Sequence, residues 1–248
     1  MRQLPLAMRL RERADFDSFV AGTNVAAVQQ LRACASGAGH GAYWLSGPRG
    51  SGKSHLLQAV CTLATATTAT ATAPGEGSDE RPTALYLPLS QLLELGPLAL
   101  ADWQHAGVLA LDELQAVIGR RDWERALFAV YREVEEQGAT LIVAATAPPA
   151  LQAFSLPDLA SRFSAAMLLA LRPLDDAAQR IALQRRARAR GLTLPDDAAL
   201  YLQRHFRRDL PTLCGLLDAI DGAAMQAQRR LTVPFIREVL GQPFPAAE

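Results

Sequence analysis

The chain has 248 residues, of which half are hydrophobic and 20% are charged, and its 25 basic side chains balance 25 acidic ones. This composition is typical of a folded globular protein and excludes a disordered chain, while the neutral balance excludes a large basic field for nucleic acid. At this length we expect one domain with an appendage, large enough to bury a hydrophobic core.

The spacing of the cysteines and the sequence of the N-terminus indicate in which cellular compartment the chain is found. Cys34, Cys61 and Cys214 lie far apart without a CxxC pattern, so the sequence predicts neither a disulfide framework nor a zinc site, and a reducing cytosol is expected. No run approaches the roughly 18 apolar residues of a membrane span, and the N-terminus becomes charged before a signal-peptide core develops. We therefore expect a cytoplasmic protein without membrane contact.

Apolar periodicity predicts alternating strands and helices up to about residue 171. A helix is expected over residues 24–35 with Asn24 as its N-cap, and an amphipathic helix is expected over residues 123–134. Strands interleaved with helices predict an α/β fold with a parallel sheet that helices cover on both faces. The five expected strands are residues 42–45, 83–87, 108–111, 140–146 and 166–171.

A phosphate-binding loop follows the first expected strand. Residues 47–54 read GPRGSGKS and match the P-loop pattern GxxxxGK[ST] in full, with a helical pattern after them. Of the 25 Lys and Arg residues only Lys53 is a lysine, and it stands where an ammonium reaches the β- and γ-phosphates. The glycines let backbone N–H groups surround phosphate oxygens, and the Ser54 hydroxyl is a ligand for Mg²⁺. The expected nucleotide contacts are Gly47, Pro48, Arg49, Gly50, Ser51, Gly52, Lys53 and Ser54; a glycine-rich turn without a ligand is the alternative.

Two carboxylates end the strand expected at residues 108–111. Four apolar residues in a row predict a strand buried on both faces, and α/β sheets bind ligands at the carboxyl ends of their strands. We expect Asp112 to order the Mg²⁺ shell and Glu113 to polarise a water molecule. The alternative is that Asp112 only caps the segment that follows.

After residue 172 the sequence predicts helices only, over residues 175–190, from 195 onward, and over 211–228 and 234–240. Residues 64–82 are low in complexity, and alternating Ala and Thr before a Pro- and Gly-rich run predict a mobile surface insertion. The arginines of residues 180–190 are interpreted as a solvated helix face, as are Arg204, Arg207 and Arg208.

These motifs together resemble the DnaA family of AAA+ ATPases from about residue 15 to residue 240. Residues 15–24 (DFDSFVAGTN) are similar to the motif that precedes the family's first helix, the P-loop continues as KSHLL, and residues 159–163 (LASRF) are similar to its arginine box. The resemblance implies a five-stranded sheet with a small helical lid, which gives an AAA+ domain over residues 15–171 and a lid over 172–248. It also implies that His55 lies at the nucleotide and that Arg162, at the carboxyl rim of the sheet, acts as an arginine finger in trans. The alternative role for Arg162 is an i,i+4 ion pair with Asp158.

Two positions depart from the family pattern. Thr146 stands where the family places a polar sensor residue after the fourth strand, and Pro211 stands where a second-sensor arginine would project from the lid. Arg207 or Arg208 is the expected substitute for that arginine. We expect ADP or ATP to bind with Mg²⁺ through the P-loop, and we expect hydrolysis by the chain itself to be weak.

Within this family the sequence is most similar to the Hda branch, the regulatory inactivators of DnaA. No helix-turn-helix region follows the expected lid, and residues 1–14 form a tail that contains Gln3, Leu4, Pro5 and Leu6. This tail is similar to the short peptide by which bacterial proteins dock on the β sliding clamp, since Gln3 can bond to a backbone while Leu4 and Leu6 fill apolar pockets. A chance match in a disordered tail is the alternative.

Three functions compete on this evidence. The first is a regulator of replication initiation that docks on the DNA-loaded β clamp of DNA polymerase III, touches DNA only through the clamp, and stimulates ATP hydrolysis by DnaA. The second is an active AAA+ ATPase of the helicase-loader type, and the third is a P-loop metabolic kinase, which the helical C-terminal part disfavours. Whether the chain also forms homo-oligomers stays open.

Overall fold

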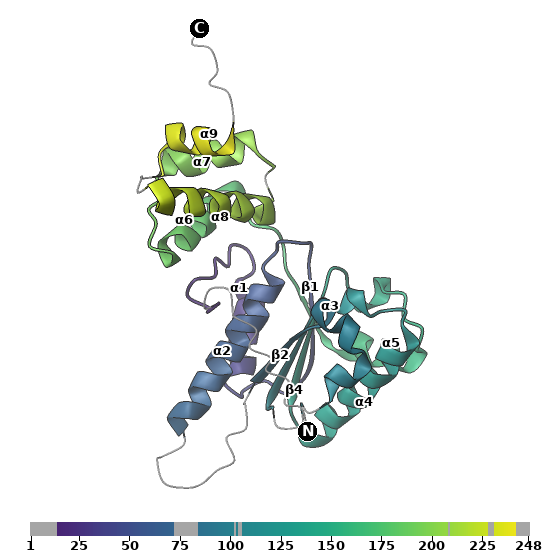
Figure 1. Cartoon of the computed structure of the whole chain (residues 1–248). Helices are drawn as coiled ribbons and strands as arrows, with labels where there is room; N and C mark the ends of the chain where they lie inside the picture. The colour runs from purple at the N-terminus through teal and green to yellow at the C-terminus, as the bar shows by residue number, and fades with distance from the viewer. Residues whose placement is uncertain are drawn as a thin grey trace.

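The structure, a computed structural model, describes residues 14–71, 84–101, 103, 106–207, 209–227 and 231–241. A parallel sheet flanked by helices is followed by an all-helical unit, as the sequence predicts, and the helical unit sits above the carboxyl ends of the strands (Figure 1). We call residues 14–170 the base and the helices after them the lid. The strands are β1 (Gly41–Ser46), β2 (Ala84–Pro88), β3 (Val108–Asp112), β4 (Thr140–Ala145) and β5 (Met167–Ala170).

The sheet has the strand order β2-β3-β4-β1-β5, and its four neighbouring pairs of strands are all parallel. Successive side chains of a strand point to opposite faces, so each central strand contributes to two cores. On β1, Trp44 belongs to one core while Tyr43 and Leu45 belong to the other. Because all strands run the same way, the loop after β1 and the end of β3 meet at one edge of the sheet.

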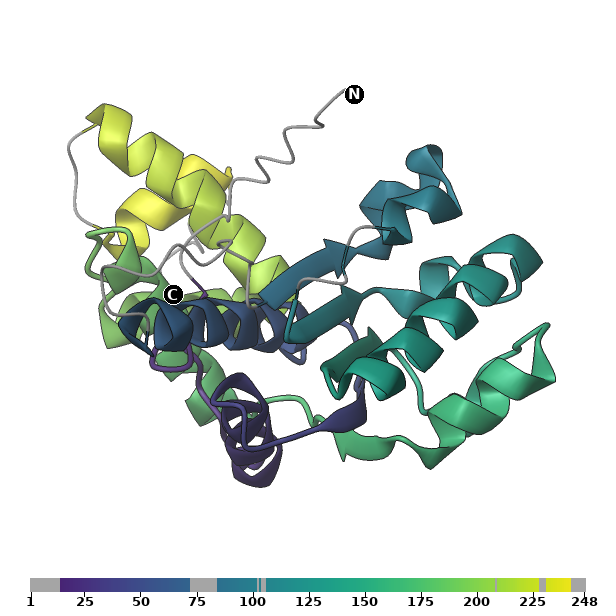
Figure 2. The ribbon, with the colours of Figure 1, turned by 90° about the horizontal axis from the view of Figure 1, so that it is seen from below.

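Helices cover both faces of the sheet (Figure 2). On one face lie α1 and α2, which pack against Leu45 and Ile142, and on the other lie α4 and α5, which pack against Trp44 and Val143. The apolar stripe predicted over residues 123–134 forms the buried side of α4. The helices of the base are α1 (Val25–Ala35), α2 (Lys53–Ala71), α3 (Leu89–Leu92), α4 (Arg121–Gln137) and α5 (Pro157–Ala165).

The lid has a core of its own, formed by buried residues such as Leu183, Leu202, Leu213 and Phe235. Its helices are α6 (Asp176–Ala189), α7 (Asp196–His205), α8 (Leu210–Ala227) and α9 (Val233–Leu240). Among the helices of the described residues, none combines the length and apolarity that crossing a bilayer requires.

The structure corrects one expectation about local structure and adds to a second. Helix α2 continues through Ala71, so residues 64–71 are helical rather than part of a surface insertion, and residues 72–82 lie outside the described part. Alanine favours the helix, and the hydroxyl groups of Thr65 and Thr67 bond to carbonyls one turn back. Asn24 occupies the N-cap position of α1, but its side chain bonds to both backbone groups of Arg172 and so ties this segment to the start of the lid.

Candidate functional site

A cavity of about 730 Å³ lies between the base and the lid, at the carboxyl edge of the sheet. Its walls come from segments that are far apart in the sequence: the segment before α1, the loop after β1 with the start of α2, the ends of β3 and β4, and helices α6 and α8. Most of the nucleotide contacts predicted from the sequence are brought together here. The lining includes Arg49, Gly50, Ser51, Gly52, Lys53, Ser54, His55, Asp112, Glu113 and Thr146.

Two glycines of the P-loop are required both by their backbone conformation and by the close approach of neighbouring side chains. Gly50 and Gly52 have φ values of +82° and +93°, which favour glycine. A Cβ on Gly50 would lie 2.3 Å from Cδ of Pro211 on the lid, and a Cβ on Gly52 would lie 2.5 Å from the Phe19 ring. The loop therefore lies too close to the lid and to Phe19 for a side chain at either position.

Lys53 begins α2 and turns back over the P-loop. Its Nζ donates to the carbonyl oxygen of Gly47 at 2.6 Å and to that of Pro48 at 3.0 Å. Burial lowers the pKa of Lys53 below its usual value, although the carboxylates of Asp112 and Glu113 act in the opposite direction. The ammonium therefore lies against the carbonyl oxygens of the P-loop, at the wall of the cavity.

Asp112 ends β3 and is 2% exposed. Its Oδ2 accepts a hydrogen bond from the Tyr86 hydroxyl at 2.8 Å, and its Oδ1 accepts one from the backbone N–H of Glu113 at 2.8 Å. Burial, together with the nearby carboxylate of Asp112, raises the pKa of Tyr86, so the phenol stays a donor to Asp112. This geometry orients the carboxylate at the cavity wall rather than making it a cap of a following helix.

Glu113 adopts a left-handed conformation with φ of 57°, the one positive φ outside glycine in the described part of the chain. Such strain in a non-glycine residue is typical of functional sites. The Ser90 hydroxyl donates to its Oε2, so the carboxylate is held toward the end of β2. No sequence pattern pointed to Ser90 or to Tyr86. Their roles arise only because β2 pairs with β3, which brings both residues close to Asp112 and Glu113.

His55 and Thr146 line the cavity from two different elements. Nε2 of His55 lies 2.8 Å from the carbonyl oxygen of Asp15, and its ring lies 5.5 Å from that of Phe19. His55 thus binds the segment before α1 to α2 while it lines the cavity. Thr146 directly follows β4 and is exposed at the cavity wall.

The lid contributes arginines that sequence analysis placed in solvent. Arg185 and Arg186 of α6 line the cavity, which corrects the interpretation of residues 180–190 as a solvated face. Nη1 of Arg185 donates to the carbonyl oxygens of Asp17 at 2.9 Å and Phe19 at 3.2 Å, and so joins the lid to the base. The position of Arg185 along α6 did not predict this contact with the base, because the contact depends on how the lid packs on the base.

Of the two arginines expected to substitute at Pro211, the structure describes Arg207, which does not line the cavity. Pro211 itself lines it, whereas the side chain of Arg207 is 88% exposed and faces Asp209 at 3.6 Å. Arg208 lies outside the described residues, as do Gln3, Leu4, Pro5 and Leu6. The described lid cations at the cavity are therefore those of α6.

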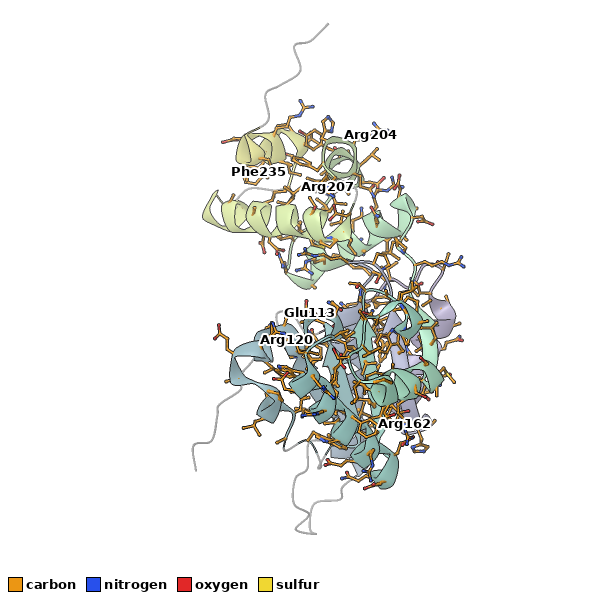
Figure 3. All side chains as sticks on the ribbon, turned by 90° about the vertical axis from the view of Figure 1, so that its right-hand side faces the viewer. Glu113, Arg120, Arg162, Arg204, Arg207 and Phe235 are labelled. Carbon is orange, nitrogen blue, oxygen red and sulfur yellow. The ribbon has the colours of Figure 1, made fainter. Side chains whose placement is uncertain are left out.

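Arg162 lies in the last turn of α5, away from the cavity. Figure 3 shows it low on the base, whereas Glu113 lies near the lid. The expectation that it lies at the carboxyl rim is wrong, because α5 runs back along the sheet and ends just before the start of β5. Its ion-pair partner is Glu135 of α4 rather than Asp158, with 2.7 Å between Nη1 and Oε2.

The residues at the cavity fit a phosphorylated ligand with a hard cation. The buried Oγ of Ser51 has no hydrogen-bond partner among the described residues, so the P-loop presents an unused polar group. The Ser54 hydroxyl and the Asp112 carboxylate are the oxygen donors that Mg²⁺ prefers, and Mg²⁺ in such sites is shared with phosphates and water.

Comparison with known families agrees with this geometry. Residues 43–170 match the family model described as the ATPase family associated with various cellular activities (AAA). Residues 175–240 match the model described as Hda, lid domain. The chain is an AAA+ protein of the Hda family. Family membership implies that the cavity of this AAA domain binds a nucleotide.

Solved structures share the fold of this Hda-family chain. Domain III of the replication initiation protein DnaA from Thermotoga maritima is 19% identical, with a TM-score of 0.77 over 93% of this chain and 98% of that one. AMPPCP-bound DnaA from Aquifex aeolicus is 20% identical, with a TM-score of 0.64 over 84% and 65%. The Holliday junction branch migration motor RuvB of Thermotoga maritima is 17% identical, with a TM-score of 0.60 over 92% and 71%.

Proposed function

We propose that this Hda-family protein is a nucleotide-bound regulator of replication initiation. It docks on the DNA-loaded β sliding clamp through Gln3, Leu4, Pro5 and Leu6, and it presents Arg162 to ATP held by DnaA. The resulting hydrolysis of ATP by DnaA prevents re-initiation. The resemblance to DnaA supports this proposal, since AAA+ subunits of one fold can place an arginine of one subunit at the nucleotide of the next.

The position of Arg162 carries the proposal. The Arg162 side chain is 45% exposed, it belongs to the face of the base away from the chain's own cavity, and it is absent from the residues that line that cavity. An arginine placed in this way has no access to its own nucleotide but is open to a partner. A cation brought to the transferring phosphoryl group of that partner stabilises the charge of the transition state and speeds hydrolysis by orders of magnitude.

The chain's own site is suited to holding a nucleotide. Lys53 and Ser54 supply the cation and the hydroxyl for ADP or ATP with Mg²⁺, and Asp112 is fixed by Tyr86. The Ser90 hydroxyl engages the carboxylate of Glu113, and Pro211 offers no cation from α8. This arrangement favours retention of nucleotide over turnover.

Pull-down with purified β clamp and DnaA, with and without nucleotide, tests the proposal. The chain is expected to bind clamp directly and to bind DnaA only when clamp and nucleotide are present. Absence of clamp binding would contradict the docking role.

A second candidate is an active AAA+ ATPase of the helicase-loader type. It is favoured by the complete set of Lys53, Ser54, Asp112 and Glu113 at one cavity. It predicts intrinsic turnover of ATP at a rate typical of ATPases, about 1 s⁻¹ or faster, without DnaA. A steady-state ATPase assay of the purified chain separates the two functions.

A further inference from the structure

Glu124 is a carboxylate in the first turn of α4 and is 0% exposed. A buried carboxylate is costly unless hydrogen bonds compensate it. Its Oε1 accepts from the backbone N–H of Gly119 at 2.7 Å and of Ser155 at 3.1 Å, and its Oε2 accepts from the N–H of Leu156 at 2.7 Å. The N-terminus of α4 adds a favourable dipole. The side chain is therefore fully engaged, and all three bonds go to loops rather than to its own helix.

The first of these loops begins at the nucleotide cavity. Gly119 ends the short segment that follows Asp112 and Glu113, and this segment is compact. The Ala116 N–H bonds to the Glu113 carbonyl at 2.9 Å, the Ile118 N–H bonds to the Leu114 carbonyl at 3.3 Å, and Leu114 and Val117 are fully buried. Because the segment is closely bonded and packed, a displacement of Glu113 moves Gly119 with it.

The second loop leads into the helix of Arg162. Leu156 directly precedes α5, whose first residue, Pro157, has no N–H to donate. At the other end of α5, the buried ring of Phe163 packs 5.2 Å from Trp44 and 5.7 Å from Tyr131. The bond from Leu156 to Glu124 thus sets the position of the N-terminal end of α5, while Phe163 anchors the end that carries Arg162.

We propose that Glu124 is a positioning residue through which the nucleotide cavity controls Arg162. It joins the loop after Glu113 to the start of α5, so a nucleotide in the chain's own cavity orders the helix whose arginine acts on the partner. The inference deepens the proposed function and rests on it. It also explains why a regulator that contributes only one arginine to the reaction has a P-loop: the bound nucleotide positions that arginine.

The substitution Glu124→Gln removes the bond to Leu156 at the start of α5 and keeps the bonds to Gly119 and Ser155. One amide oxygen can still accept from Gly119 and Ser155, but the amide NH₂ then faces the N–H of Leu156, so the bond to α5 is lost. Asp122→Asn is the matched control, since Asp122 is an exposed carboxylate in the same first turn. Thermal unfolding of both variants reports whether they fold.

Hydrogen exchange tests the coupling in the chain alone. In the wild type and in Asp122→Asn, addition of ADP is expected to slow exchange in a peptide covering residues 155–163, and in Glu124→Gln this response is expected to disappear while ADP still binds. A wild-type peptide that does not respond to ADP, or a response that persists in Glu124→Gln, would overturn the inference. The wild-type measurement alone can overturn the inference, so the inference stays testable even if a variant fails to fold.

Stimulation of DnaA gives the second measurement. Glu124→Gln is expected to lower the maximal rate of ATP hydrolysis by DnaA by about tenfold to 100-fold, the cost of misplacing a catalytic group by about an ångström, with the half-saturating concentration unchanged. Asp122→Asn should stimulate DnaA like the wild type, because its carboxylate lies in the same turn but is exposed. Full stimulation by Glu124→Gln would contradict the positioning role. If the wild type fails to stimulate DnaA, the proposed function fails, while the exchange experiment still judges the coupling.

Discussion

The guanidinium of Arg162 on α5 donates to the carboxylate of Glu135 on α4, with 2.7 Å between Nη1 and Oε2. Both side chains are 45% exposed, and the Arg162 guanidinium also lies 5.8 Å from the centre of the Tyr131 ring. The pair joins two helices on the outside of the base, and it must open before Arg162 can reach a phosphate of a partner.

Opening this pair by substitution is predicted to be harmless to fold and activity. For Glu135→Gln we expect a change in unfolding free energy below about 0.5 kcal/mol, since exposed ion pairs contribute little. Stimulation of ATP hydrolysis by DnaA should be at least equal to that of the wild type, because Arg162 no longer has a competing carboxylate. Thermal unfolding and the hydrolysis assay check both expectations; a loss of stimulation would instead mean that Glu135 orients the arginine.

Removal of the ammonium at the P-loop is predicted to weaken nucleotide binding. For Lys53→Ala we expect a loss of about 10-fold to 100-fold in affinity for ADP and ATP, because hydrogen bonds to charged groups contribute about 1.5–3 kcal/mol. Calorimetric titration measures the affinity, and an unchanged unfolding temperature shows that the loss is local. Equal affinity in the variant and the wild type would contradict the assignment of the phosphate site.

The contact of Arg185 with the carbonyl oxygens of Asp17 and Phe19 is predicted to slow the release of nucleotide. For Arg185→Ala we expect release to be several-fold faster, because loss of a partly exposed charged donor costs about 1 kcal/mol. Stopped-flow release of a fluorescent ADP analogue measures the rate. Arg188→Ala is the control on the exposed side of the same helix, and equal rates in all three chains would show that the lid is held closed by other contacts.

The tail is predicted to act independently of the nucleotide site. Deletion of residues 1–7, or the double change of Leu4 and Leu6 to Ala, should abolish binding to the β clamp and leave nucleotide affinity unchanged. Gel filtration with purified clamp, alongside calorimetry with ADP, measures the two properties. Continued co-elution of the truncated chain with clamp would locate the docking site elsewhere.

The fold was predictable because its signals are local. A strand buried on both faces needs a continuous apolar run, and β3 and β4 show one. The P-loop could also be predicted, since its glycines and Lys53 are adjacent in the sequence. Asp112 followed from its place at the end of a buried strand.

Contacts made across the fold could not be predicted in the same way. Three kinds of contact join residues distant in the sequence: the pairing of Arg162 with Glu135, the contact of Arg185 with the segment before α1, and the bonds from Ser155 and Leu156 to Glu124. In the sequence, Arg185 cannot be distinguished from the other arginines of its helix, such as the exposed Arg188. Glu124 likewise looks like an ordinary charged residue of a helix. Only the packing of α6 on the base and of α5 beside α4 gives these side chains their roles.

The measurement that tests the central claim most directly follows the conversion of DnaA-bound ATP to ADP in the presence of clamp loaded on DNA. Wild-type chain is expected to speed the conversion, and Arg162→Ala is expected to abolish that effect while it keeps its fold, its nucleotide affinity and its binding to clamp. An arginine supplied in trans is worth about 10³-fold or more in rate, so the difference is large. Full stimulation by Arg162→Ala would contradict the account and show that the catalytic arginine lies elsewhere.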